Sequence, residues 1–148
     1  MQGHTLMTHI EGLRWAQDYE THLYATDDRW RLPRRLPAFY VIQTGRKSTQ
    51  GEHYVAFIIE TDSSVTYFDS YGVPPYQRVK TYLRGCELIR YNSRLLQSPF
   101  SSSCGLYVIC FAAFRFAGCP FKKFLSLFSE DPLLNDVVVE DFIKSLQD

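Results

Sequence analysis

Residues 97–110 read QSPFSSSCGLYVIC, a polar loop that runs directly into an apolar segment, with Cys104 at the junction. The apolar run predicts a buried helix that begins at Cys104, and Gly118 with Pro120 just beyond it predicts where that helix ends. The first N–H groups of a helix have no intrahelical partner and favour negative charge. A thiol at this position is therefore biased toward the thiolate, although a lone cysteine on an apolar helix is more often a core residue.

Strand patterns lie upstream of this helix. Residues 53–59 (HYVAFII) are apolar on both alternations, which is typical of a central strand covered on both faces. Residues 65–69 predict its hairpin partner after the polar turn TDSS. Further strands are expected at residues 38–44 and 87–91, and helices at residues 6–13, 76–84, 121–128 and 136–146. Strands gathered mid-chain with helices around them predict an α+β fold in which a mixed central sheet is flanked by helices.

Composition limits the classes of protein that fit. With 148 residues, 45% apolar and 16% aromatic, the chain is long enough for one globular domain, residues 1–148. Sixteen basic residues balance sixteen acidic ones, so nothing global demands a nucleic-acid or membrane partner. Residues 29–47 carry six basic side chains and no acid, which fits either a solvated face or a polyanion site.

The four cysteines form no CxxC pair and have no metal-ligand spacing, which predicts reduced thiols, an intracellular setting and no metal site. The apolar run at residues 106–114 is too short to span a bilayer, and no N-terminal signal peptide is visible.

A cysteine nucleophile needs a base to take its proton and a group to orient that base. Among the four histidines, only His53 begins a buried strand, and Asp69 ends the strand that follows. A three-residue hairpin loop places the two side chains on the same face as near neighbours, whereas an even-numbered loop separates them. Gln97, seven residues before Cys104, carries an amide that can donate to a developing oxyanion.

Each of these positions also has an ordinary interpretation. His53 fits a satisfied histidine at a strand end, and Asp69 fits a residue that caps the bend at residues 70–72. Asp62 and Glu52 are the other carboxylates that could orient the imidazole. Cys104, His53, Asp69 and Gln97 each lie at the edge of an element, and we expect the four together to form a site.

Three segments resemble the adenovirus protease (adenain) family: residues 51–57 (GEHYVAF), residues 67–72 (YFDSYG), and Gln97 separated by six residues from the CGL at 104–106. These cysteine endopeptidases share a fold with the SUMO- and ubiquitin-like-protein proteases, and the likeness covers about residues 24–116. It implies an adenain/Ulp1-like fold with Cys104 as nucleophile and His53 as general base and then acid. Asp69 is then the orienting carboxylate, and Gln97 forms the oxyanion hole with the Cys104 N–H.

The resemblance also implies a role. It predicts a viral cysteine endopeptidase that cleaves structural precursor polypeptides at small, glycine-containing sites during virion maturation. The protein is then a monomer in the host nucleus and the virion, without a metal or small-molecule cofactor. The alternatives are a SUMO- or ubiquitin-like-protein isopeptidase and a non-catalytic binding module on the same fold.

Cys86 lies eleven residues before Gln97, the spacing at which adenoviral enzymes carry a cysteine that bonds to a viral peptide cofactor. The resemblance therefore implies a Cys-containing activating peptide, and the alternative is an ordinary semi-buried thiol. The neutral charge of the chain differs from the basic character of that family and argues against its DNA cofactor.

Overall fold

The computed structural model describes residues 1–44, 53–86, 89–99 and 101–147. The alternative carboxylate Glu52 and residues 87–88 of the last expected strand lie outside the described residues.

A mixed five-stranded sheet forms the centre of the molecule, in the order β1-β2-β3-β4-β5. Its strands are β1 (Glu20–Ala25), β2 (Ala38–Gln43), β3 (Tyr54–Ile59), β4 (Val65–Phe68) and β5 (Ile89–Tyr91). β3 pairs antiparallel with β2 and β4, whereas β1 and β5 pair parallel to their neighbours. Every residue of β2, β3 and β4 is buried, as expected for strands covered on both faces.

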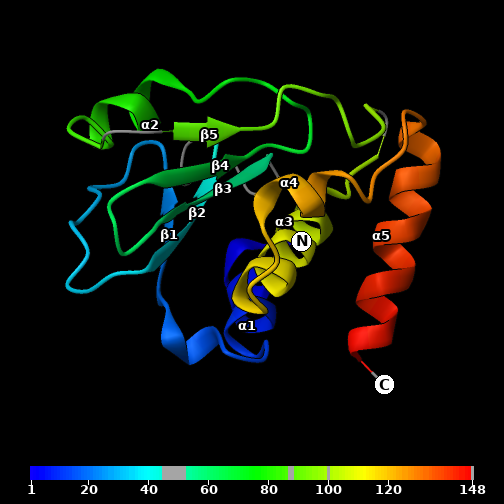
Figure 1. The fold of residues 1–148 in the computed structure, drawn as a ribbon, viewed down its shortest axis with the longest axis horizontal. Coiled ribbons are helices and arrows are strands. Elements are labelled where there is room, and N and C mark those ends of the chain that lie inside the picture. Colours follow the sequence, from blue (N-terminus) through cyan, green and yellow to red (C-terminus); the bar gives the residue numbers. More distant parts are fainter. Residues whose placement is uncertain (45–52, 87–88, 100, 148) are drawn as a thin grey trace.

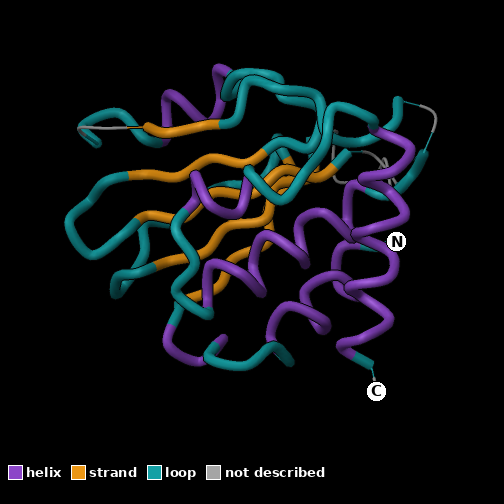
Figure 2. The backbone as a smooth tube through the Cα atoms, turned by 45° about the vertical axis from the view of Figure 1, so that its right-hand side comes forward, coloured by secondary structure: helices purple, strands orange, loops and turns teal. Residues whose placement is uncertain are grey.

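Helices cover the two faces of the sheet unequally. The helices are α1 (Gly3–Glu11), α2 (Gln77–Tyr82), α3 (Cys104–Phe116), α4 (Phe121–Leu125) and α5 (Pro132–Leu146), with one 3-10 turn at Ala16–Asp18. α1, α3, α4 and α5 contribute to the larger apolar cluster, which includes alternate residues of β3 such as Ala56 and Ile58. The other alternation of β3 packs with α2 and Trp30 in a second cluster. Figures 1 and 2 show the sheet on one side and most of the helices on the other.

Two parts of the sequence prediction are corrected. α5 begins at Pro132 and not at Asp136, because the Asp131 side chain accepts a hydrogen bond from the Leu133 N–H at 3.1 Å and caps the helix. β1 was not expected at all, since its outward positions are polar. It forms because it pairs along its whole length with buried β2.

Candidate active site

A three-residue loop joins β3 to β4 and sets the register of the hairpin. The Glu60 N–H donates to the Ser64 carbonyl at 2.8 Å, and Ser63 has a positive φ of 67°. Ala56 pairs with Phe68, so continuation of the ladder places residue 55 opposite residue 69 and His53 opposite residue 71. The start of β3 and the end of β4 therefore share one edge of the sheet.

His53 and Asp69 meet at that edge. The His53 Nε2 lies 2.7 Å from the Asp69 Oδ1, and the Asp69 side chain is fully buried. The same oxygen accepts the Tyr71 N–H at 2.8 Å, so Asp69 also caps the bend that follows it. Asn92 fixes the backbone of this residue, since the Asp69 N–H donates to the Asn92 Oδ1 at 3.1 Å and the Asn92 side chain donates to the Asp69 carbonyl. One carboxylate oxygen is thus held by His53 and Tyr71, and the backbone of the same residue is held by Asn92.

Cys104 lies at the first position of α3, beside the imidazole. Among the described residues, the His53 Nδ1 is buried without a hydrogen bond of ordinary geometry, yet it is close enough to the thiol for each group to shift the pKa of the other. Burial alone opposes charge on His53, but Asp69 and Cys104 outweigh it and raise the pKa of the imidazole to about 9. Apo sites often hold such contacts loosely, and they tighten when substrate binds.

The Cys104 thiol differs chemically from the other buried thiol of α3. Burial raises the thiol pKa at both positions. At Cys104 this effect is overcome by His53 and by the backbone N–H groups of Tyr54 and Gly105, so its pKa lies below the ordinary value. At Cys110 nothing compensates, and burial raises the pKa to about 12. Of these two thiols, Cys104 is therefore the one whose surroundings favour the thiolate.

Gln97 is fully buried on the loop that leads to α3. Its Oε1 accepts the Ser70 hydroxyl at 2.6 Å, which ties the loop to the end of β4. Its Nε2 donates to the Ser101 carbonyl at 3.1 Å and approaches the Ser101 hydroxyl at 3.2 Å. In this state the amide is directed onto Ser101, so donation to an oxyanion needs one N–H to turn away from that residue.

Comparison with known proteins gives the fold. No protein-family model and no curated protein sequence matches the chain. The solved structure of the ASFV pS273R protease matches with a TM-score of 0.51 and 18% identity, over 68% of this chain and 43% of that one. ChlaDub1 from Chlamydia trachomatis matches with a TM-score of 0.52 and 16% identity, over 74% of this chain and 58% of its own. This chain has the adenain/Ulp1-like cysteine protease fold. The predicted α+β architecture is confirmed, and the chain spans about half the length of these two neighbours.

Several residues at this edge of the protease fold were not singled out from the sequence. The Tyr71 ring stacks on the His53 ring, with centroids 4.5 Å apart. The Tyr54 hydroxyl donates to the Met1 carbonyl at 3.0 Å, and the Met1 side chain lies 3.6–3.9 Å from where a Cβ on Gly105 would stand. The N-terminal segment therefore borders the start of α3. No local pattern predicts a contact between residues so far apart in sequence.

Other predicted candidates lie away from this edge. Asp62 is at the opposite end of the hairpin, where its carboxylate accepts the Ser64 N–H and hydroxyl. Cys86 is a half-buried free thiol just before the described part of β5. Within the described residues, no group of histidine, cysteine and acidic side chains could hold a metal ion, and no helix is long and apolar enough to cross a bilayer.

Proposed function

We propose that this chain is a cysteine endopeptidase that cleaves viral structural precursor polypeptides during virion maturation, in the host nucleus and the virion. The observation that carries the proposal is the convergence of His53, Asp69 and Cys104 from β3, β4 and α3. A buried carboxylate holds one nitrogen of the imidazole, and the other nitrogen faces a thiol of lowered pKa. A binding module has no need of such an acid–base pair.

The geometry suits acyl transfer through a thioester. Asp69 keeps the proton on the His53 Nε2, so Nδ1 is free to take the proton of the Cys104 thiol. The thiolate attacks the scissile carbonyl carbon, and the Cys104 N–H with the Gln97 amide stabilises the resulting oxyanion. When the C–N bond breaks, the imidazolium gives its proton to the departing amine. His53 then deprotonates a water that cleaves the thioester and restores the thiol.

Limited access to the thiol supports a small residue at the cut. Cys104 is only 9% exposed. Tyr71 covers one face of the His53 ring, and Tyr54 with Met1 borders the start of α3. A glycine in the substrate lets its backbone approach between these side chains, whereas a large side chain must displace them.

A glycine-rich peptide library tests the function. The purified chain is incubated with the library, and the products are sequenced by mass spectrometry. Cuts flanked by glycine are expected from the wild type and from Cys119→Ala, whose partly exposed thiol lies outside the site. Cys104→Ala should cut nothing and keep its fold. Folded ubiquitin-like modifiers are tested beside the library, and cleavage confined to them assigns the chain to the isopeptidases. An active Cys104→Ala protein contradicts the mechanism.

A further inference from the structure

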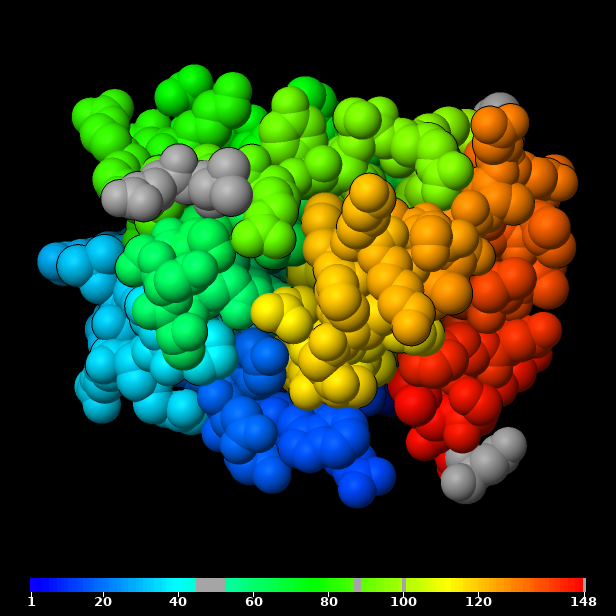
Figure 3. Space-filling model, viewed as in Figure 1, coloured from blue at the N-terminus to red at the C-terminus, as the bar shows by residue number. Residues whose placement is uncertain are grey.

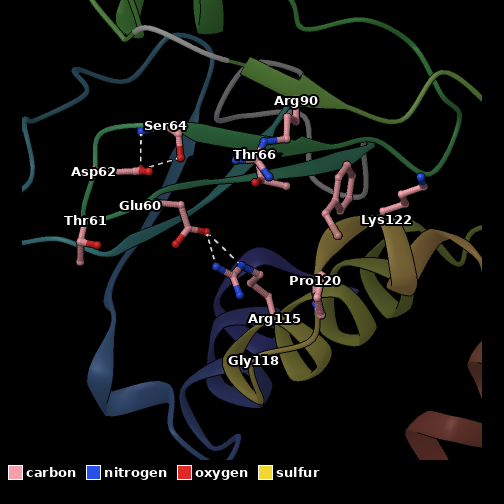
Figure 4. Close-up of a pocket in the computed structure, with 11 residues that line it drawn as sticks. Glu60, Thr61, Asp62, Ser64, Thr66, Arg90, Arg115, Gly118, Pro120 and Lys122 are labelled. Carbon is pink, nitrogen blue, oxygen red and sulfur yellow. Dashed lines mark hydrogen bonds and ion pairs between the residues drawn. The ribbon is translucent and has the colours of Figure 1, made fainter.

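A polar cleft opens at the end of the sheet opposite His53 and Asp69. It has a volume of about 410 Å³ and lies between the β3–β4 turn, β5, the end of α3 and the start of α4. In Figure 3 it opens between the green surface of the hairpin and the gold surface of α4. Figure 4 shows Thr66 and Arg90 on the sheet side and Pro120 and Lys122 on the helix side.

The cleft gathers three cations from three elements: Arg90 of β5, Arg115 of α3 and Lys122 of α4. Arg115 is neutralised, because its Nε and Nη2 lie 2.9 and 2.8 Å from the Glu60 Oε1. In the part of the chain that the structure describes, the side chains of Arg90 and Lys122 make neither a hydrogen bond nor an ion pair, although Arg90 is near enough to Asp62 to help lower the pKa of that carboxyl.

The second acid of the cleft does not cancel both remaining cations. Asp62 is fully solvent-exposed and its carboxylate already accepts the Ser64 N–H and hydroxyl at 2.9 and 2.6 Å. Three cations against two carboxylates leave one net positive charge in the cleft. One added anionic group therefore balances it, with Arg90 and Lys122 as free donors on opposite walls.

The rest of the lining favours a peptide. Pro120 and the partly buried Phe121 give an apolar surface beside the cations, which suits an apolar residue next to an acidic one. A polyphosphate backbone brings many negative charges close together. The cleft can balance one of them, and Glu60 and Asp62 on the rim repel the others.

We propose that this cleft binds one acidic side chain of a polypeptide, with Arg90 and Lys122 as its charged ligands and Phe121 as the contact for a neighbouring apolar residue. The cleft lies at the far end of β3 and β4 from the candidate active site, so its occupant does not touch Cys104. The proposal therefore stands whether or not the chain is a protease.

The test is an NMR titration of the full ¹⁵N-labelled chain with the capped peptide acetyl-Ala-Glu-Leu-Ala-amide and with its glutamine counterpart. The peptides contain no glycine, so binding is read apart from any cleavage. The glutamate peptide should shift the amide signals of Thr66, Arg90 and Gly118. The glutamine peptide should bind at least about tenfold more weakly than the glutamate peptide, because it lacks the charge.

Charge-matched variants locate the site. Arg90→Gln with Lys122→Gln should weaken binding of the glutamate peptide by about tenfold or more. Lys80→Gln with Arg84→Gln removes the same charge from the exposed surface of the α2 region and should leave binding unchanged. Equal binding of the two peptides, or equal binding by both double variants, overturns the proposal. Inorganic phosphate that binds as tightly as the glutamate peptide overturns the assignment to a polypeptide.

Discussion

Asp69 accepts two hydrogen bonds on one oxygen, from the His53 Nε2 and from the Tyr71 N–H. Because Nε2 is occupied, Nδ1 is the nitrogen that faces Cys104, and the protonation state of the whole site depends on this one carboxylate. Since the pKa of Cys104 is lowered and that of His53 is raised to about 9, the thiolate–imidazolium pair is the favoured form between the two pKa values.

Asp69→Asn should therefore move the alkaline limb of the pH–rate profile. In the wild type that limb reports loss of the His53 proton near pH 9. The amide removes the charge and most of the hydrogen-bond strength, so the pKa of His53 should fall toward 6.5 and turnover should fall with it. The contribution of protonated His53 to stability is complete below about pH 6.5 and is lost as the pH rises through about 9. NMR titration of the imidazole measures the shift directly, and an unmoved His53 pKa contradicts the assignment of Asp69.

Gln97 is proposed to donate to the oxyanion, and it also ties Ser70 to Ser101. Gln97→Ala should lower kcat by about 10²–10³-fold with little change in KM, because the donor is aimed at charge that appears only in the transition state. Gln97→Glu is the matched variant, since it keeps an acceptor for the Ser70 hydroxyl and loses the N–H donors. It should lose at least as much kcat, and it should unfold at a lower temperature because its buried carboxylate oxygen faces the Ser101 carbonyl. A raised KM with unchanged kcat makes Gln97 a binding residue instead.

The sequence predicts part of this site because hairpin parity is a local property. A three-residue loop at residues 61–63 is enough to place His53 and Asp69 on one face, and the structure has that loop. Contacts made by distant segments are not encoded locally. Asn92 reaches Asp69 from beyond β5, and Met1 reaches Tyr54 from the start of the chain. These contacts follow from the tertiary packing.

At the scale of elements, the bend after β4 positions the loop that carries Gln97. Gly72 has a positive φ of 72°, and a Cβ there would lie 2.5 Å from the carbonyl of Arg94. The Ser70 carbonyl accepts the N–H groups of both Leu96 and Gln97. The bend and the loop therefore pack backbone against backbone, with no room for a side chain between them.

Gly72→Ala should cost more stability than the same change at Gly85. Both glycines have positive φ, which costs an alanine about 1–2 kcal/mol. Nothing lies within 4 Å of a Cβ at Gly85, whereas at Gly72 the backbone of Arg94 must also shift, which adds about 1–3 kcal/mol. Urea denaturation of the two variants measures the difference. Equal losses contradict the close approach at Gly72.

The predictability of the elements follows their burial. β3 and α3 were predicted because their apolar runs are continuous, and β3 is covered on both faces. β1 was missed because Glu20, His22 and Tyr24 alternate as a polar, hydrogen-bonded row, which a single sequence does not distinguish from a loop. The early start of α5 had a readable signal in Asp131 and Pro132, which are favoured at N-cap and N1.

At the scale of the whole molecule, sixteen basic and sixteen acidic residues leave no net charge, so no long-range field draws the chain to a polyanion. We propose that it works without DNA and as a monomer, and that its partners are recognised locally. One local candidate is the outer edge of β5, which in the described sheet pairs only with β4.

A peptide that adds to this edge would lie beside Cys86, which is a free and half-buried thiol. We propose that a Cys-containing viral peptide pairs with β5 through main-chain hydrogen bonds and is retained by a disulfide to Cys86. Burial raises the pKa of this thiol, so little of it is thiolate at neutral pH and exchange with a peptide disulfide should be slow and faster at higher pH.

The measurement is the activity of the chain before and after addition of Cys-containing peptides from viral precursors, with and without reductant. Activation should be lost with reductant and in Cys86→Ser, because the disulfide keeps the weakly paired peptide at high effective concentration. Cys119→Ser also removes a partly exposed thiol, but one that lies between α3 and α4 and not at the start of β5, so it should respond like the wild type. A chain that is fully active alone, and indifferent to the peptide and to Cys86→Ser, leaves Cys86 a structural residue and rules out a peptide cofactor at β5.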